Sequence, residues 1–335
     1  MRREFSNTLE QLAVEDDSIV LITGDLGYNA FENLKPKLGK RFINAGVAEQ
    51  NMVGVAAGFA HKGYKVFCYS IAPFIVYRCL EQFRNDVCFN NLPVFLVGNG
   101  GGYGYGIMGS SHHAIEDLAC LSGQQNANVW VPAFSDEVGS VMRQIVAEAR
   151  PAYLRLGTGQ TTPDNSYMSG SFKVIHAPES AEVTVFALGP IANNVMTALS
   201  AAEDLVSKVN VVTALHFPLE ISADLEIMIR KAPSILVAEE HISTGGLAQQ
   251  LCVQLLEKDV FPHNFKSLKA EGYPNNRYGS QTYHQKLSNL DPDSIILHIR
   301  QLMSIARRKR FYPSVKANFD CRDLALLNSL ELLCR

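Results

Sequence analysis

The feature that most constrains the fold of this chain is a repeated alternation of short apolar runs with longer amphipathic stretches. The short runs suit buried strands, and the stretches between them have the apolar spacing of helices that cover a sheet. Strands and helices that alternate in this way form a mainly parallel sheet with helices on both faces. We therefore predict an α/β fold, with strands near residues 18–23, 65–69, 94–97, 127–131 and 152–156.

A polar segment interrupts this alternation at residues 157–170, where turn-forming residues are dense and no periodicity is present. Beyond it the alternation restarts, and a chain of 335 residues suits two domains better than one. We predict two doubly wound domains, residues 1–160 and a smaller domain at 172–306. A basic and leucine-rich tail follows at 307–335.

Charge and composition exclude several classes of protein. The formal net charge of -3 gives no basic field that would attract nucleic acid or an anionic membrane. No apolar run reaches the roughly 18 residues that a membrane-spanning helix needs. Seven scattered cysteines without Cys-x-x-Cys spacing, together with an amphipathic N-terminus that lacks the apolar core of an export signal, predict a cytoplasmic protein.

A carboxylate stands at the start of a predicted helix, within residues 42–58. Glu49 is followed by small and apolar residues, so the helix packs closely and holds the carboxylate at a fixed place. An acidic residue at a helix N-terminus is stabilised by the helix dipole, and this structural role is by itself the commoner one.

The run 44–52, Asn-Ala-Gly-Val-Ala-Glu-Gln-Asn-Met, resembles the Gly-Ile-Ala-Glu-Gln-(His/Asn)-Met signature of transketolases and deoxyxylulose phosphate synthases. The resemblance covers roughly residues 5–300. It implies that the first domain is a thiamine-diphosphate pyrimidine-binding domain and the second a transketolase C-terminal domain. It also implies that Glu49 is catalytic, because in this family the glutamate hydrogen-bonds the aminopyrimidine ring and helps to form the cofactor's nucleophilic carbon.

An aromatic segment follows at 69–86 and resembles the family's aromatic platform and the Arg-x-x-(Asp/Glu)-Gln helix after it. The resemblance implies that Phe74 stacks on the pyrimidine ring of the cofactor, with Tyr77 as a second contact. Arg78 becomes a candidate substrate-binding residue. Aromatic side chains in helices ordinarily pack in the core, so position within the motif carries this interpretation.

The glycine-rich segment that follows allows two interpretations. Gly104, Gly106 and Gly109 satisfy the G-x-G-x-x-G pattern of dinucleotide sites. Such a site turns directly from strand into helix, however, and needs an acidic residue about 20 positions further on. Here a long loop intervenes after Val97, and the first acidic residue after a strand is Asp136. The pattern is therefore a weak indication of nicotinamide binding.

The same segment, at 109–117, resembles the family loop Asp-Gly-x-(Ser/Thr)-His-Gln-x-x-Glu-Asp. The resemblance implies that His112 is a catalytic and substrate-binding histidine, and that His113, in place of the glutamine, shares in binding substrate. Met108 replaces the family's aspartate and cannot accept a hydrogen bond from a sugar hydroxyl. The replacement predicts an unusual donor or acceptor.

Arg155 lies at a predicted strand end, where open α/β sheets bind ligands and where the family carries an arginine that contacts substrate phosphate. It is a candidate substrate-binding residue. Pairing with a neighbouring carboxylate is an equally good interpretation of the sequence.

The resemblance does not extend to the family's diphosphate- and metal-binding motif, and no metal ligand set is visible. The nearest run, at 24–27, reads Gly-Asp-Leu-Gly. The resemblance thus implies an N-terminal transketolase subunit that holds the diphosphate of thiamine diphosphate and Mg2+, in an α2β2 heterotetramer within which this chain homodimerises.

The implied reaction is transfer of a two-carbon ketol unit from a ketose or ketose phosphate to an aldehyde. Two alternatives stay open. One is a decarboxylating relative that acts on a ketoacid, either deoxyxylulose phosphate synthase-like or the β chain of a 2-oxoacid dehydrogenase. The other is a non-catalytic scaffold subunit, for which Met108 is the best indication.

Overall fold

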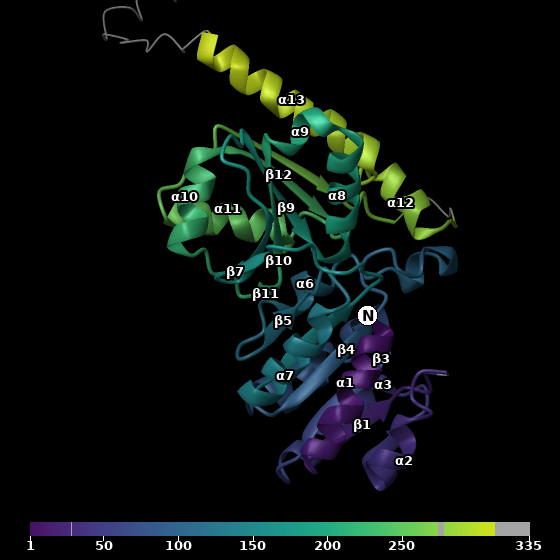
Figure 1. Ribbon diagram of the computed structural model, residues 1–335. Coiled ribbons are helices and arrows are strands. Elements are labelled where there is room, and N and C mark those ends of the chain that lie inside the picture. The colour runs from purple at the N-terminus through teal and green to yellow at the C-terminus, as the bar shows by residue number, and fades with distance from the viewer. Residues whose placement is uncertain (28, 274–277, 312–335) are drawn as a thin grey trace, which may run out of the picture.

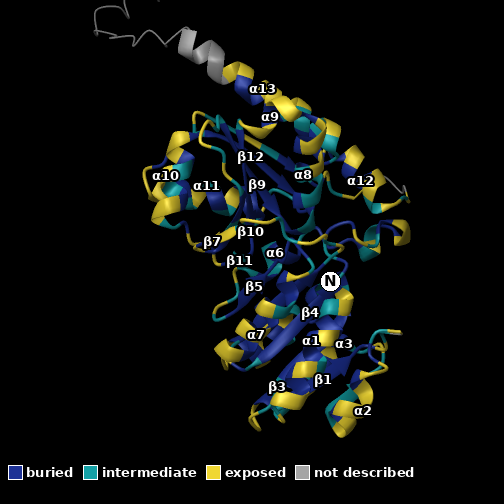
Figure 2. Ribbon diagram, viewed as in Figure 1, coloured by how far each residue is buried: buried dark blue, intermediate teal, exposed yellow. Residues whose placement is uncertain are grey.

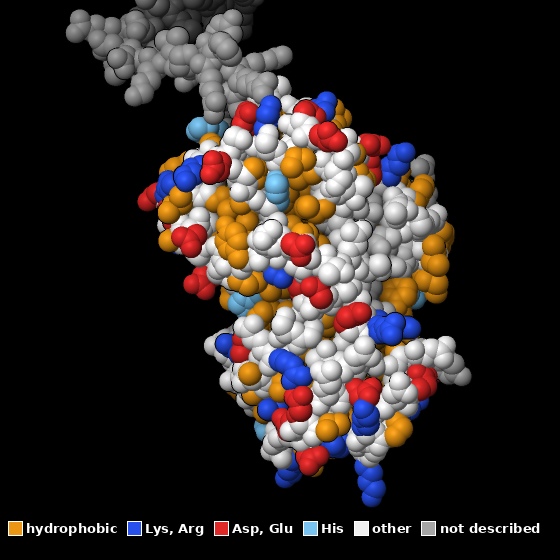
Figure 3. All heavy atoms as spheres, viewed as in Figure 1, with side chains coloured by type: hydrophobic (Ala, Val, Ile, Leu, Met, Phe, Trp, Pro, Cys, Tyr) orange, Lys and Arg blue, Asp and Glu red, His pale blue; other side chains and the backbone are white. Residues whose placement is uncertain are grey.

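The computed structural model describes residues 1–27, 29–273 and 278–311, with side chains through residue 305. It contains two sheets, each covered by helices, that lie one above the other in Figure 1. The predicted α/β fold with two domains is confirmed. No helix among the described residues is long and apolar enough to cross a membrane. Figure 3 shows acidic and basic side chains interspersed over the face in view.

The first sheet has seven strands in the order β11-β5-β6-β4-β3-β1-β2. All pairings are parallel except the one between β11 and β5. Strand β11 comes from the second half of the chain but pairs with β5 at the edge of this sheet, so the first sheet contains strands from both halves of the chain. The strands are β1 (Ile19–Thr23), β2 (Phe42–Asn44), β3 (Lys65–Ile71), β4 (Val94–Asn99), β5 (Asn128–Trp130), β6 (Ala152–Leu156) and β11 (His216–Phe217).

The second sheet has six strands in the order β13-β12-β9-β10-β8-β7. Its strands are β7 (Tyr167–Ser169), β8 (Phe172–His176), β9 (Val183–Leu188), β10 (Val209–Ala214), β12 (Ser234–Glu239) and β13 (Asn264–Lys269). Strand β7 lies near the end of the segment 157–170, in which the sequence shows no periodicity. An edge strand of three residues is too short to show periodicity, and its antiparallel pairing with β8 defines it.

Helices cover both faces of each sheet, and Figure 2 shows the strands as the most buried part of the molecule. The apolar face of the first helix is buried as its spacing predicts, at Phe5, Leu9, Leu12 and Ala13. The helices are α1 (Arg2–Glu15), α2 (Leu34–Leu38), α3 (Glu49–Ala60), α4 (Ala72–Tyr77), α5 (Leu80–Gln82), α6 (Asp117–Leu121), α7 (Glu137–Glu148), α8 (Ala192–Ala201), α9 (Glu203–Val206), α10 (Ala223–Lys231), α11 (Leu247–Glu257), α12 (Gln281–Leu287) and α13 (Pro292–Phe311), with shorter turns η1 (Gly39–Arg41), η2 (Phe83–Cys88), η3 (Gly106–Met108), η4 (Ser110–His112) and η5 (Gly189–Ile191).

The predicted tail at 307–335 divides into two parts. Its first residues continue helix α13, which packs along α8 of the second domain. Residues 312–335, including the leucine-rich stretch, lie outside the described residues, as do the side chains of the basic cluster at 307–310.

Glu239, the last residue of β12, caps the N-terminus of helix α11. Its carboxylate accepts hydrogen bonds from the backbone N–H groups of Leu247 at 2.6 Å and Ala248 at 3.1 Å. Burial raises the pKa of this carboxyl from 4.5 to about 8. At neutral pH the group therefore carries a proton in the folded chain.

This pKa predicts a pH-dependent stability. Between pH 4.5 and 8 the folded chain holds a proton on Glu239 that the unfolded chain has released, so the free energy of unfolding falls as pH rises through this window. The fall is roughly 1 kcal/mol per pH unit. Glu239→Gln, which resembles the protonated form, is expected to remove this component. Urea unfolding of both proteins at pH 6 and pH 8 measures it, and parallel pH dependences would contradict the prediction.

Candidate active site

Glu49 lies at the first turn of α3, beside the carboxyl ends of β1 and β3. Its side chain is only 2% exposed. One carboxylate oxygen, Oε1, accepts a hydrogen bond from the Ser70 hydroxyl at 2.9 Å, and the other, Oε2, lies 3.0 Å from Nη1 of Arg78. The carboxylate is thus buried, charge-paired and fixed in direction.

Gly24, which follows β1, lies next to this carboxylate. A Cβ atom there would lie 3.4 Å from Oε1 of Glu49 and 3.5 Å from the Ser70 hydroxyl. Gly24 thus lies directly beside the hydrogen-bonded pair of Glu49 and Ser70.

Phe74, on helix α4, lies half-buried beside the glutamate. The guanidinium of Arg78 sits over its ring, 4.0 Å from the centroid, in a cation–π contact. The side chain of Arg78 is 45% exposed and connects Phe74 to Glu49. The structure therefore places Arg78, the predicted substrate-binding residue, between Glu49 and Phe74.

Tyr77 points toward the start of helix α6. Its hydroxyl donates to a carboxylate oxygen of Glu116 at 3.0 Å and accepts from the Glu116 backbone N–H at 3.2 Å. Burial, together with the nearby carboxylates of Asp117 and Glu116, raises the pKa of Tyr77 far above its usual value. Tyr77 is thus a neutral phenol that ties α4 to α6, near the site but engaged with Glu116.

His112 comes close to Phe74. Their rings meet edge to face at a centroid distance of 5.0 Å, and the Ser111 hydroxyl lies 3.0 Å from Nδ1 of His112. His112 ends the short turn η4, which directly follows turn η3. At the end of η3, Met108 is 51% exposed, next to the exposed Ile107. Glu49, Phe74, Arg78 and His112 therefore form one continuous site.

His113 does not share the position of His112. Its side chain is 1% exposed and packs between Tyr103 and His284, with ring centroids 5.1 Å and 4.9 Å away. Burial, and secondly the neighbouring His284, lowers the pKa of His113. His113 is a buried neutral imidazole behind the site.

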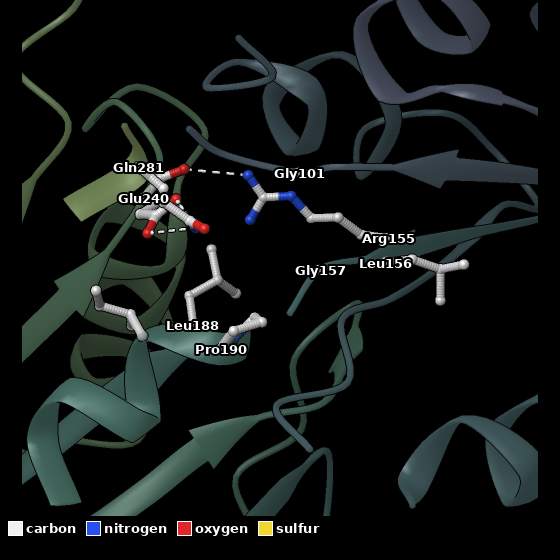
Figure 4. A pocket seen from close by; sticks show the side chains of 9 residues that line it. Gly101, Arg155, Leu156, Gly157, Leu188, Pro190, Glu240 and Gln281 are labelled. Atoms are coloured by element: carbon white, nitrogen blue, oxygen red, sulfur yellow. Dashed lines mark hydrogen bonds between the residues drawn. The ribbon is translucent and has the colours of Figure 1, made fainter. Parts of the chain in front are cut away.

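Arg155 is buried at the contact between the two domains. Its Nε lies 2.8 Å from Asp117 Oδ2, and Nη2 donates to the carbonyls of Ala114 at 2.7 Å and Glu240 at 3.0 Å. Figure 4 shows the guanidinium pointing toward Glu240. Carboxylate pairing, one of the two interpretations open from the sequence, therefore accounts for this side chain.

Several residues of the site were not anticipated from the sequence. Ser70 gave no signal, because a single serine at a strand end is common. Asp117 was noted only as part of the loop motif, and its pairing with Arg155 and Tyr153 requires the fold. No group of acidic, histidine or cysteine side chains able to hold a metal ion occurs in the described parts of the chain.

A buried glutamate thus stands at a helix start on a mainly parallel sheet, and Arg78 and Phe74 connect it to His112. The family description "Transketolase, pyrimidine binding domain" matches residues 1–163. The chain is 31% identical over 269 residues to one subunit of the apulose-4-phosphate transketolase of Phocaeicola vulgatus, covering 77% of this chain and 84% of that protein. The chain belongs to the transketolase family.

Two further comparisons show how much of each relative this chain matches. The 1-deoxy-D-xylulose-5-phosphate synthase of Syntrophus aciditrophicus is 28% identical over 314 residues, which cover 90% of this chain but only 47% of that protein. A solved structure described as a split gene transketolase, inactive beta4 tetramer, has a TM-score of 0.76 at 26% identity, covering 90% of this chain and 97% of that one. This chain is thus similar in extent to separately encoded transketolase subunits.

Proposed function

We propose that this chain is the pyrimidine-binding subunit of a two-chain, thiamine-diphosphate-dependent transketolase. It works with an N-terminal subunit that holds the cofactor's diphosphate and Mg2+, in an α2β2 assembly in the cytoplasm. The observation that carries the proposal is the buried carboxylate of Glu49, held by Ser70 and Arg78 next to Gly24. Similarity to one subunit of the Phocaeicola transketolase supports the division into two chains.

The residues present fit the cofactor's pyrimidine ring. Glu49 supplies a desolvated carboxylate, and Phe74 supplies a ring face for stacking. Arg78 covers that face, and its 45% exposure lets it move to solvent when a ligand enters. When bound, thiamine diphosphate would supply the carbon nucleophile of the reaction.

The chain's own groups then hold and move protons. Glu49 fixes the orientation of the pyrimidine through a hydrogen bond, and its burial makes that bond strong. His112, half-buried beside Phe74, is placed to exchange a proton with an oxygen of the donor, which suits an imidazole near neutral pH. The reaction we propose is transfer of a two-carbon ketol unit from a ketose or ketose phosphate to an aldehyde.

Met108 points to a changed substrate. A thioether and the adjacent Ile107 side chain, both exposed, border the histidine loop where a carboxylate would accept a hydrogen bond from a hydroxyl. We propose that the donor or acceptor lacks, or carries in a modified form, the hydroxyl next to the reacting carbonyl.

Met108→Asp is expected to raise kcat/KM for a conventional ketose phosphate donor about tenfold, because a hydrogen bond to a charged group contributes roughly 1.5 kcal/mol. Ile107→Asp adds the same charge one residue away and serves as the control. Steady-state assays of the assembled enzyme with both variants measure the effect. Equal changes in the two variants would contradict a specific role for position 108.

A decarboxylating reaction is the second candidate, since the synthase comparison covers 90% of this chain. Carbon dioxide release from pyruvate by the assembled enzyme, in place of ketol transfer, would favour it.

Calorimetric titration of thiamine diphosphate and Mg2+ tests the proposed assembly. Binding is expected when this chain is mixed with its N-terminal partner subunit, and not with this chain alone. Absence of binding in the mixture would overturn the catalytic proposal, and binding by this chain alone would overturn the shared site.

A further inference from the structure

The glycine-rich loop, residues 98–109, packs against the second domain at each of several glycines. A Cβ atom on Gly106 would lie 2.7 Å from the Gly279 carbonyl oxygen and 2.8 Å from Cδ2 of His284. A Cβ on Gly102 would lie 2.3 Å from a carboxylate oxygen of Glu240. Since a side chain at these positions would collide with the second domain, the glycines permit close approach between the domains.

Glu240 anchors the beginning of this loop. Its carboxylate accepts the backbone N–H of Tyr103 at 2.8 Å, and Gln281 of helix α12 donates to both of its oxygens at 3.0 Å. Gln285, also on α12, donates to it as well. The bonds between Glu240 and Gln281 are visible in Figure 4. The loop and helix α12 thus bind the same buried carboxylate.

His284 anchors the end of the loop. Its Nε2 lies 3.3 Å from the carbonyl oxygen of Gly106, the first residue of turn η3. Its ring stacks on Tyr103 at 5.1 Å and meets His113 at 4.9 Å, and the His284 side chain is 1% exposed. A second-domain side chain therefore contacts the loop just before Met108 and, through His113, just after His112.

We propose that His284 is a positioning residue, through which helix α12 of the second domain holds the loop that carries His112. Its imidazole donates from Nε2 to the Gly106 carbonyl and, packed against His113, fixes the two short turns between them. The second domain thereby sets the placement of the active-site histidine. The catalytic consequence rests on the proposed function, whereas the hold on the loop does not.

His284 can affect the site because it contacts both ends of the segment 106–113. Turns η3 and η4 are short and follow each other directly, so a displaced Gly106 displaces Met108 and His112 with it. A shift of about 1 Å at a reacting group can lower a rate up to 10²-fold. The contacts of His284 lie at both ends of this segment, which makes it the side chain best placed to prevent such a shift.

Two variants separate the hydrogen bond from packing. His284→Leu keeps apolar bulk and removes the donor, whereas His284→Gln keeps a donor near the position of Nε2. We expect His284→Leu to lower kcat about tenfold with a smaller change in KM, and His284→Gln to restore most of the loss. His298→Leu, on helix α13 of the same domain, is the matched control.

A second readout does not require activity. Hydrogen exchange of the full chain, followed by mass spectrometry, is expected to speed up in peptides covering 100–113 in His284→Leu, with β9 and β12 unchanged. Gly106→Ala pushes the loop away from α12 but keeps the imidazole, and it is also expected to speed up exchange in these peptides. Gly123→Ala is the control, because a Cβ atom there meets no other atom within 4 Å, and it is expected to leave the exchange unchanged.

Each combination of the exchange and activity results tests a different part of the proposal. Unchanged exchange in both His284→Leu and Gly106→Ala would overturn the proposal, whatever the enzyme's activity. Faster exchange without any change in kcat would confine His284 to structure and overturn its positioning role. If the wild-type assembly shows no ketol transfer while exchange responds as expected, the proposed function fails and the hold on the loop stands.

Discussion

Replacing Glu49 by glutamine is expected to lower kcat of the assembled enzyme by about 10²- to 10⁴-fold, the range that a positioned acid–base group contributes. Glutamine keeps the shape of the side chain and can still accept the hydrogen bond of Ser70, but it has no negative charge and cannot share a proton as a carboxyl does. Arg78 is left without its partner, yet its 45% exposure keeps it solvated. Steady-state kinetics of the two-chain enzyme at saturating thiamine diphosphate measure the effect.

Glu81→Gln is the matched control, because Glu81 is exposed on helix α5 just after Arg78. Tryptophan fluorescence reports on folding, since the chain's single tryptophan, Trp130, is buried in β5 beside His216. If Glu49→Gln left the activity of the assembly unchanged, the chain would be a scaffold subunit, and the catalytic interpretation of Glu49 would be wrong.

Most of the fold could be predicted from the sequence because buried parallel strands read as short apolar runs. The first helix, five strands of the first sheet (β1, β3, β4, β5 and β6) and three strands of the second (β9, β10 and β12) followed from that signal. Strands β2, β7 and β11, with two or three residues each, escaped because they are too short to carry a period. Their existence depends on pairing partners, which periodicity within a segment does not reveal.

The residues of the site also fall into two groups: those that sequence motifs predict and those that only the fold places. Glu49, Phe74 and His112 lie in motifs with fixed spacing, and the structure brings them together. The position of His113 was not predictable, because the neighbours that bury it, Tyr103 and His284, lie far apart in sequence and belong to different domains. The glycine-rich loop shows that a motif match can mislead. Its glycines match a dinucleotide pattern, whereas several of them permit close packing against the second domain.

Arg155 shows how one residue can satisfy two interpretations until its burial is known. The guanidinium is 4% exposed and its ion-pair partner, Asp117, is fully buried, so both charges depend on each other for compensation. Asp117 Oδ2 also accepts the Tyr153 hydroxyl at 2.8 Å. A buried ion pair adds little net stability compared with apolar residues of similar size. Removing one partner, however, leaves an uncompensated buried charge.

Arg155→Met is therefore expected to destabilise the chain by about 3 to 5 kcal/mol, because Asp117 then remains buried without its cation. Adding Asp117→Asn removes that charge while keeping an acceptor for Tyr153, so the double variant is expected to recover most of the loss. Arg300→Met, which breaks the exposed pair between helix α13 and Asp204, is the control and is expected to cost only about 0.2 to 1 kcal/mol. Urea unfolding of the four proteins measures these differences. A stable Arg155→Met protein with a raised KM for phosphorylated substrates would instead assign the arginine to substrate binding, since a ligand contact is not needed to hold the two domains together.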